Sequence, residues 1–157
     1  MKTMKTHPRV GFTLIELIIV ITLIAIIAGI YIIVGNPAGQ LAAARNQKRI
    51  SDLQTIMLAI RNNIDSQGNE QFSCAAGPIP TSTTDMSSNA GGYNIAPCLT
   101  QDHVIYSMPF DPNTSGTHYT SNSDYDTGYF IVMNSSTGQI TLSAPYAELG
   151  KTITLTQ

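Results

Sequence analysis

The sequence predicts an α+β fold: a long N-terminal helix, apolar in its first half and amphipathic in its second, packed on a small C-terminal antiparallel sheet. Three observations support this prediction. Residues 12–34 form an apolar run, residues 40–64 carry apolar side chains at helical spacing, and short β-rich runs separated by turn residues begin near position 103. The 157 residues allow one domain with a modest core.

Charge is distributed unevenly along the chain. Residues 1–11, interpreted as a leader, contain three basic residues and no acidic residue. Residues 62–157 contain eight acidic residues and only one lysine, Lys151. Nucleic-acid binding requires clustered Lys or Arg, so we expect the C-terminal head not to bind nucleic acid. The acidic charge is compatible with binding a hard cation or with solubility alone.

The apolar run of residues 12–34 is long enough to span a membrane. As a helix it extends over roughly 34 Å, and Glu16 is its one charged residue. A cleaved secretory signal has a shorter apolar stretch followed by a small-x-small site, so we interpret the run as an anchor. Three basic residues lie on each side of it. The leader lies closer to the run and the cysteines favour export, so we expect a cytoplasmic N-terminus and an extracytoplasmic head.

Residues 9–17 read RVGFTLIEL, a basic leader ending in glycine, then phenylalanine and, four positions later, Glu16. This segment resembles the processing site of type IV prepilins and type II secretion pseudopilins. The resemblance implies the pilin fold, cleavage by a prepilin peptidase between Gly11 and Phe12, and methylation of the new Phe12 amine. It also assigns Thr13 and Glu16 to the assembly motif.

Glu16 is the residue of this run that most needs an explanation. A carboxylate in mid-membrane costs about 2.5–3.5 kcal/mol, so such residues are usually paired. Taken alone, Glu16 is either functional or a tolerated interfacial residue. The resemblance implies that it neutralises the Phe12 amine of a neighbouring subunit and sets one axial stagger. The implied partners are copies of this chain, other pilins or pseudopilins, the prepilin peptidase, an inner-membrane assembly platform and the lipid bilayer.

Residues 35–64 are expected to contain a break followed by a second helix. The break is predicted at Gly35-Asn36-Pro37 and Gly39, because proline lacks an amide donor and glycine loosens the backbone. From Ile50 onward, apolar residues recur at spacings typical of one helical face. The expected core face comprises Leu41, Ile50, Leu53, Ile56, Met57, Ile60 and Ile64, and the opposite face comprises Arg49, Asp52, Gln54, Arg61 and Asn62.

The head, residues 65–157, is predicted to begin with a long irregular connection over residues 65–101, which is rich in turn-forming residues. Cys74 and Cys98 lie in this connection. In an exported chain two cysteines favour a disulfide over a zinc site or free thiols. Strands are expected over 103–108, 128–133, 139–143 and 151–156, with a hairpin turn at 134–138.

Two further segments resemble the C-terminal part of major pseudopilins and small pilins. These are the proline-rich turn at 108–112 and the acidic segment at 124–129. In major pseudopilins an acidic loop in this region holds calcium. The resemblance implies a calcium site in which Asp111, Asp124 and Asp126 supply oxygen ligands. The alternative is that these aspartates are ordinary turn residues.

The chain has no recognisable catalytic motif. His103 is assigned to a strand and His118 to a loop, and neither has a second His or Cys at metal-ligand spacing. We therefore expect a structural filament subunit, located at the cell surface or in the periplasm, and not an enzyme. The alternatives are a single-span tethered extracytoplasmic binding domain that does not polymerise and, less favoured, a tethered enzyme with a site built from scattered residues.

Overall fold

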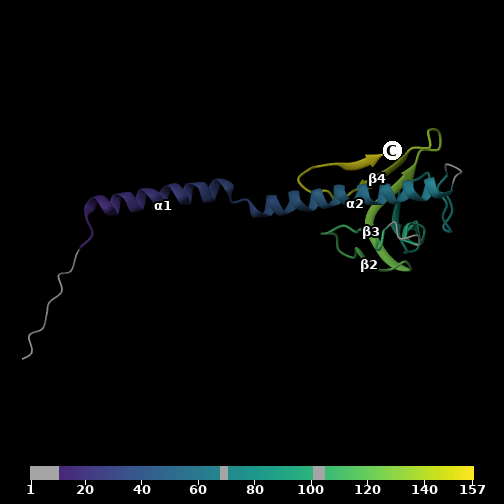
Figure 1. Cartoon of the computed structure of the whole chain (residues 1–157), viewed down its shortest axis with the longest axis horizontal. Helices are drawn as coiled ribbons and strands as arrows, with labels where there is room; N and C mark the ends of the chain where they lie inside the picture. Colours follow the sequence, from purple (N-terminus) through teal and green to yellow (C-terminus); the bar gives the residue numbers. More distant parts are fainter. Residues whose placement is uncertain (1–10, 68–70, 101–104) are drawn as a thin grey trace, which may run out of the picture. The chain divides into compact units, whose positions relative to one another are not determined.

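The computed structural model describes residues 11–67, 71–100 and 105–157 (Figure 1). The chain divides into two compact units, Met1–Ala38 and Gly39–Gln157. Helix α1, Leu14–Val34, lies in the first unit, and helix α2, Pro37–Gln67, begins at the boundary and enters the second. A small antiparallel sheet completes the second unit. The predicted α+β, pilin-like architecture is confirmed, while residues 1–10 of the predicted leader lie outside the described residues.

The predicted interruption between the two helices lies at Gly35 and Asn36, while Gly39, also predicted to break the helix, lies within α2. Gly35 adopts φ −86° and ψ 51°, outside the helical region. A Cβ atom at this position would lie 2.5 Å from the carbonyl oxygen of Tyr31, so the close approach requires glycine. Pro37 occupies the first position of α2, where a missing N–H leaves no intrahelical bond unmade.

Helix α2 buries one face in the core of the head. The residues of this face with the largest apolar side chains are Leu53, Ile56, Met57 and Ile60, all at most 3% exposed. Their spacing of three and four is the one that the sequence pattern predicted. They pack in one cluster with inward-facing residues of the sheet.

The assignment of α2 residues to faces was wrong at four positions. Leu41 and Ile50 were expected in the core but are 59% and 37% exposed. Arg49 and Asp52 were expected to face solvent but are buried. Continued toward the N-terminus at spacings of four and three, the buried face reaches Arg49 and not Ile50. The N-terminal part of the buried face is therefore polar.

The sheet contains five antiparallel strands, with the order β1-β3-β4-β5 and with β2 also paired to β3. Their bounds are Thr84–Ser87 (β1), His118–Ser121 (β2), Asp124–Met133 (β3), Ile140–Ala144 (β4) and Ile153–Thr156 (β5). Along β3, Tyr125, Tyr129 and Ile131 point into the core at a period of two. Figure 1 shows α2 lying along the sheet beside β3 and β4.

The β3–β4 hairpin and the last strand agree with the predicted ones, but the first half of the head does not. The connection over 65–101, expected to be irregular, contains β1 and a short helix, α3, at Ala96–Thr100. Residues 105–108 form no strand, and 103–104 lie outside the described residues. Ile105 and Met108 are nevertheless buried, so their apolar character reflects burial in a loop and not strand pairing. His118, expected in a loop, is the first residue of β2.

Candidate functional site

The predicted processing site lies immediately before helix α1. Gly11 and Phe12 precede the helix, and Phe12 is 83% exposed. Thr13 is the N-cap: its backbone is extended, and its hydroxyl oxygen accepts a hydrogen bond of 3.3 Å from the Glu16 N–H. An N-cap hydroxyl satisfies one of the otherwise unpaired amides of the first turn. Thr13 therefore starts the helix one residue beyond the expected cleavage point.

Glu16 lies in the first turn of α1, where a negative charge is favoured by the helix dipole. Its side chain is exposed, and in the described part of the chain its carboxylate has no hydrogen-bond or ion-pair partner. The structure thus places the carboxylate near the helix start and leaves it available to a group outside the chain.

Helix α1 presents its apolar side chains outward. From Leu14 to Tyr31 the large apolar side chains are 45–78% exposed. This is the one helix in residues 11–67, 71–100 and 105–157 that is long and apolar enough to cross a membrane. The hydroxyl of Thr22 donates to the carbonyl oxygens of Ile18 and Ile19 at 2.9 and 2.8 Å, so its polar group is satisfied within the helix.

A buried ion pair joins α2 to the loop before β2. The Arg49 guanidinium donates to both carboxylate oxygens of Asp111, with Nε–Oδ2 2.6 Å and Nη2–Oδ1 3.0 Å, and both side chains are at most 1% exposed. Burial alone would raise the pKa of Asp111. The hydrogen bonds from Arg49, from the Asn113 N–H and from Thr114 outweigh burial and hold the pKa below its usual range.

The β4–β5 loop is tied to the same helix through Glu148. Arg45 contacts both of its carboxylate oxygens at 2.7 and 2.6 Å, and Arg49 Nη1 adds a contact of 3.0 Å. Asn46 exchanges two hydrogen bonds with the backbone of Glu148. The hydrogen bonds from Arg45 and Arg49 lower the pKa of Glu148 to about 2. We call Arg45, Arg49, Asp111 and Glu148 the arginine clamp.

The three aspartates predicted to bind calcium each have other partners. The counter-charge of Asp111 is Arg49. Asp124 contacts His118 Nε2 at 3.1 Å, and Asp126 accepts from Asn89 Nδ2 at 3.1 Å and from the Gly128 N–H at 2.9 Å. Across the described ranges, no three His, Cys, Asp or Glu side chains form a group that could hold a metal ion. At Asp111, therefore, the counter-charge within the chain is a guanidinium.

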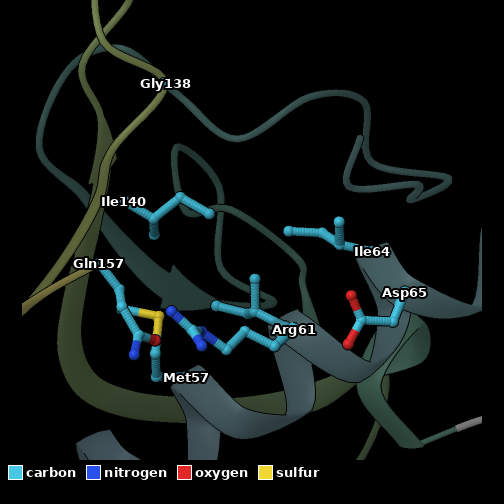
Figure 2. A pocket seen from close by; sticks show the side chains of 8 residues that line it. Met57, Arg61, Ile64, Asp65, Gly138, Ile140 and Gln157 are labelled. Atoms are coloured by element: carbon cyan, nitrogen blue, oxygen red, sulfur yellow. The ribbon is translucent and has the colours of Figure 1, made fainter. Parts of the chain in front are cut away.

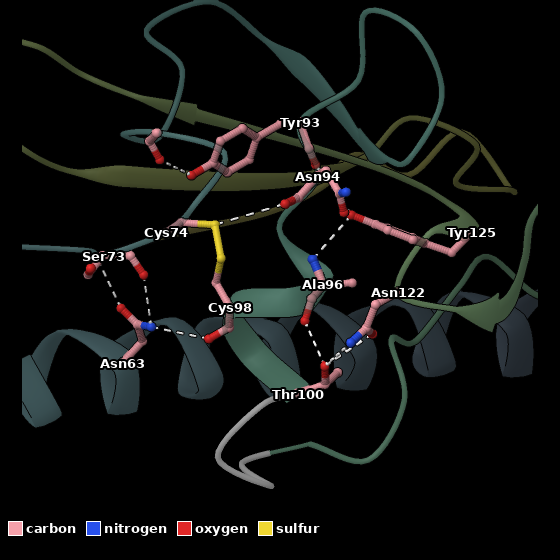
Figure 3. The surroundings of a disulfide bond; sticks show 11 residues. Asn63, Ser73, Cys74, Tyr93, Asn94, Ala96, Cys98, Thr100, Asn122 and Tyr125 are labelled. Carbon is pink, nitrogen blue, oxygen red and sulfur yellow. Dashed lines mark hydrogen bonds between the residues drawn. A yellow bond between two sulfur atoms is a disulfide. The ribbon is translucent and has the colours of Figure 1, made fainter.

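The predicted disulfide is confirmed between Cys74 and Cys98 (Figure 3). It joins the segment after α2 to helix α3. Asn63 of α2 reinforces this connection: its Nδ2 donates to the carbonyl oxygens of Ser73 and Cys98, both at 3.1 Å, and its Oδ1 accepts from the Ser73 N–H at 3.0 Å. The bridge and Asn63 together hold the connection against the helix.

The clamp was missed because Arg49 was assigned by residue type. The spacing that identifies the core face also reaches positions 46 and 49, and a polar residue at a core position indicates a buried partner. The signal was present, although it does not identify Asp111 or Glu148 as the partners. Both lie more than sixty residues away in the sequence.

One comparison with known proteins identifies the N-terminal segment. Residues 11–32 match the family described as the prokaryotic N-terminal methylation motif. No curated protein and no solved structure matches the chain. The matched segment begins at Gly11 and includes Phe12, Thr13 and Glu16. The chain therefore carries, over residues 11–32, the prepilin-type signal of type IV pilins and pseudopilins.

Proposed function

We propose that the chain is a structural subunit of a helical filament, either a type IV pilus or a type II secretion filament, and that its activity is assembly. The observation that carries the proposal is the prepilin-type signal on residues 11–32, which coincides with an apolar helix exposed along its described length. Exposed apolar area of this extent requires lipid or other helices as a partner. In this proposal α1 contacts lipid before assembly and other helices in the assembled filament.

Cleavage between Gly11 and Phe12 creates a positively charged amine at the start of α1. Glu16 lies four residues further on, about 6 Å along a helix axis. Each charge is costly in lipid, and pairing the amine of one subunit with the carboxylate of its neighbour removes both costs. Because the two groups lie at different heights, this pairing sets a fixed axial offset between adjacent subunits.

The head is proposed to lie outside the cytoplasm, with the leader inside before processing. The disulfide supports this orientation, because such bonds persist in oxidising compartments. The number of basic residues that follow the span does not favour either orientation, because it equals the number that precede it. In the folded structure, however, Arg45 and Arg49 are paired with carboxylates of the head, and Lys48 is paired with Asp52 of the same helix. The prepilin peptidase and an inner-membrane assembly platform are the further partners proposed.

The experiment that tests the proposal is an intact-mass measurement of the protein from its native membrane. We expect the loss of residues 1–11 and the gain of one methyl group. An unprocessed mass would overturn the filament proposal and favour a tethered extracytoplasmic binding domain. Electron microscopy of surface and periplasmic fractions, labelled with an antibody to the head, then distinguishes a pilus from a secretion filament.

A further inference from the structure

A groove runs between α2 and the end of the sheet formed by β4 and β5 (Figure 2). It consists of two adjoining cavities of about 280 and 310 Å³, which share Met57, Arg61 and Gln157. Apolar side chains line both cavities: Ile60, Ile64 and Ile140 in the first, and Leu58 and Leu155 in the second. Asp65 also lines the first cavity, whereas Arg61 is, among the described residues, the one charged side chain that lines the second. We call this surface the Arg61 groove.

Arg61 differs from the two arginines of the clamp. Arg45 and Arg49 are both paired with carboxylates. Arg61 is exposed, and its guanidinium forms no hydrogen bond or ion pair with any described residue. Figure 2 shows it extended across the groove toward Met57 and Gln157. A guanidinium over an apolar floor is suited to receive a carboxylate together with an adjoining apolar or neutral surface.

The start of β3 and its flanking strands are acidic. Asp126 of β3 pairs with Ser87 of β1 on one side and with His118 of β2 on the other, so β1 and β2 flank this part of β3. The Arg61 groove lies by Ile140, which pairs with Met133 at the other end of β3. Asp85, Asp124 and Asp126 lie on β1 and at the start of β3. The Asp124 side chain is 63% exposed and follows the turn of the β2–β3 hairpin, so it lies at a projecting point. One subunit therefore carries an unpaired cation near one end of β3 and exposed acidic charge at the other end.

We propose that the Arg61 groove receives the β2–β3 hairpin of a second copy of this chain, with Asp124 of that copy pairing with Arg61. The inference rests on the proposed filament function. A contact between two different surfaces of the same subunit repeats without closing and so generates a helical array, whereas a self-complementary contact stops at a dimer. Opposite charges at opposite ends of β3 provide such a contact.

Asp124 is a better partner than its acidic neighbours. The Asp126 carboxylate accepts from Asn89 and from the Gly128 N–H, and Asp85 is only partly exposed. Asp124 contacts His118 in an exposed pair, through Oδ1 at 3.1 Å, and Thr120 through a side-chain hydrogen bond. An exposed ion pair of this kind contributes little to stability. Asp124 can therefore exchange it for a contact with Arg61.

Charge reversal in the full-length chain tests the pairing. Arg61→Glu and Asp124→Arg should each lower the amount of assembled filament about tenfold or more, since each places like charges at the contact. The double variant should restore assembly, while Lys151→Glu, another exposed cation of the head, should leave it unchanged. Failure of the double variant to recover assembly above either single variant would overturn the pairing.

A photo-crosslinking amino acid at Leu58 separates this inference from the proposed function. In assembled filaments it should crosslink to residues 118–126 of a second copy, whereas the same group at Leu149, which is similarly exposed, should not. Filaments that form but crosslink from Leu58 to another segment or another protein would overturn the inference and leave the proposed function intact. A processed chain that forms no filament and no crosslink would overturn both.

Discussion

Helices α1 and α2 follow each other with two residues between them, yet they stand in opposite relations to the rest of the chain. The large apolar side chains of α1 are exposed from Leu14 to Tyr31, while α2 buries Leu53, Ile56 and Ile60 almost completely. The more apolar helix is thus the less buried one. Apolar content alone does not determine burial inside a chain, because burial requires a partner surface within reach.

The polar groups of the two helices differ in the same way. Glu16 of α1 has no partner among the residues described, whereas Arg49 of α2 is buried against Asp111 and Glu148. The buried charge of Arg49 is thus neutralised within the described part of the chain, whereas the charge of Glu16 is not. Variants of the two helices should therefore fail in different assays, α1 variants in assembly and α2 variants in stability.

The largest effect is expected at Glu16. Glu16→Ala should leave leader removal intact and abolish filaments, because the amine of the neighbouring subunit then has no counter-charge in lipid. Intact mass and filament yield measure the two steps separately. Thr22→Val is the matched control within α1, since the Thr22 hydroxyl bonds only to its own helix, and it should assemble normally. Normal filaments from Glu16→Ala would mean that α1 needs no charge pairing.

The next largest effect is expected at Arg49. Arg49→Met keeps the apolar stem but leaves Asp111 buried without its counter-charge, which should cost about 3–5 kcal/mol in the free energy of unfolding of the head. Denaturant unfolding of the detergent-solubilised full chain, followed by near-ultraviolet circular dichroism, measures this loss. Processing should be unaffected, because α1 is unchanged.

Arg61→Met is the control for this prediction, since Arg61 is exposed and unpaired in the described structure. It should change the free energy of unfolding by no more than about 0.5 kcal/mol. The double variant Arg49→Met with Asp111→Leu should recover part of the stability, because it removes the buried charge. Recovery should be incomplete, since Asp111 also accepts hydrogen bonds from residues 113 and 114.

The contrast between the helices also explains what could be predicted from the sequence. Helix α1, the break at Gly35 and the apolar part of α2 follow from local composition and spacing, and the structure confirms them. The arginine clamp depends on contacts with segments 62 and 99 residues away, which local periodicity does not encode. The same holds for β1, whose pairing with β3 crosses a long connection. The motif at 11–16 was recognisable because its residues are contiguous.

Reduction of the disulfide should have a comparable or smaller effect, confined to the head. Cys74 and Cys98 are separated by 24 residues, and opening such a loop removes about 3–4 kcal/mol on the chain-entropy model. Thermal unfolding with and without reductant measures the effect, and the helical signal of α1 should persist in both. Asn63→Ala, which removes only the hydrogen bonds that reinforce the connection, should give a smaller shift. A melting temperature that reductant leaves unchanged would show that Asn63 and packing hold the connection in place without the disulfide.

The smallest effect is expected from acid, and it should appear in the head alone. The folded-state pKa of Glu148 is lowered to about 2 from an unfolded value of 4.5. The stabilisation from its ionised form is therefore complete above about pH 4.5 and is lost as the pH falls toward 2. The lowered pKa of Asp111 acts in the same direction.

Glu148→Gln should flatten this part of the stability–pH curve, whereas Asp65→Asn, which changes an exposed carboxylate without an ion pair in the described residues, should leave the shape of the curve unchanged. An identical acid dependence in wild type and Glu148→Gln would exclude Glu148 as the source of the acid sensitivity of the head, and Asp111→Asn would then test the remaining clamp carboxylate.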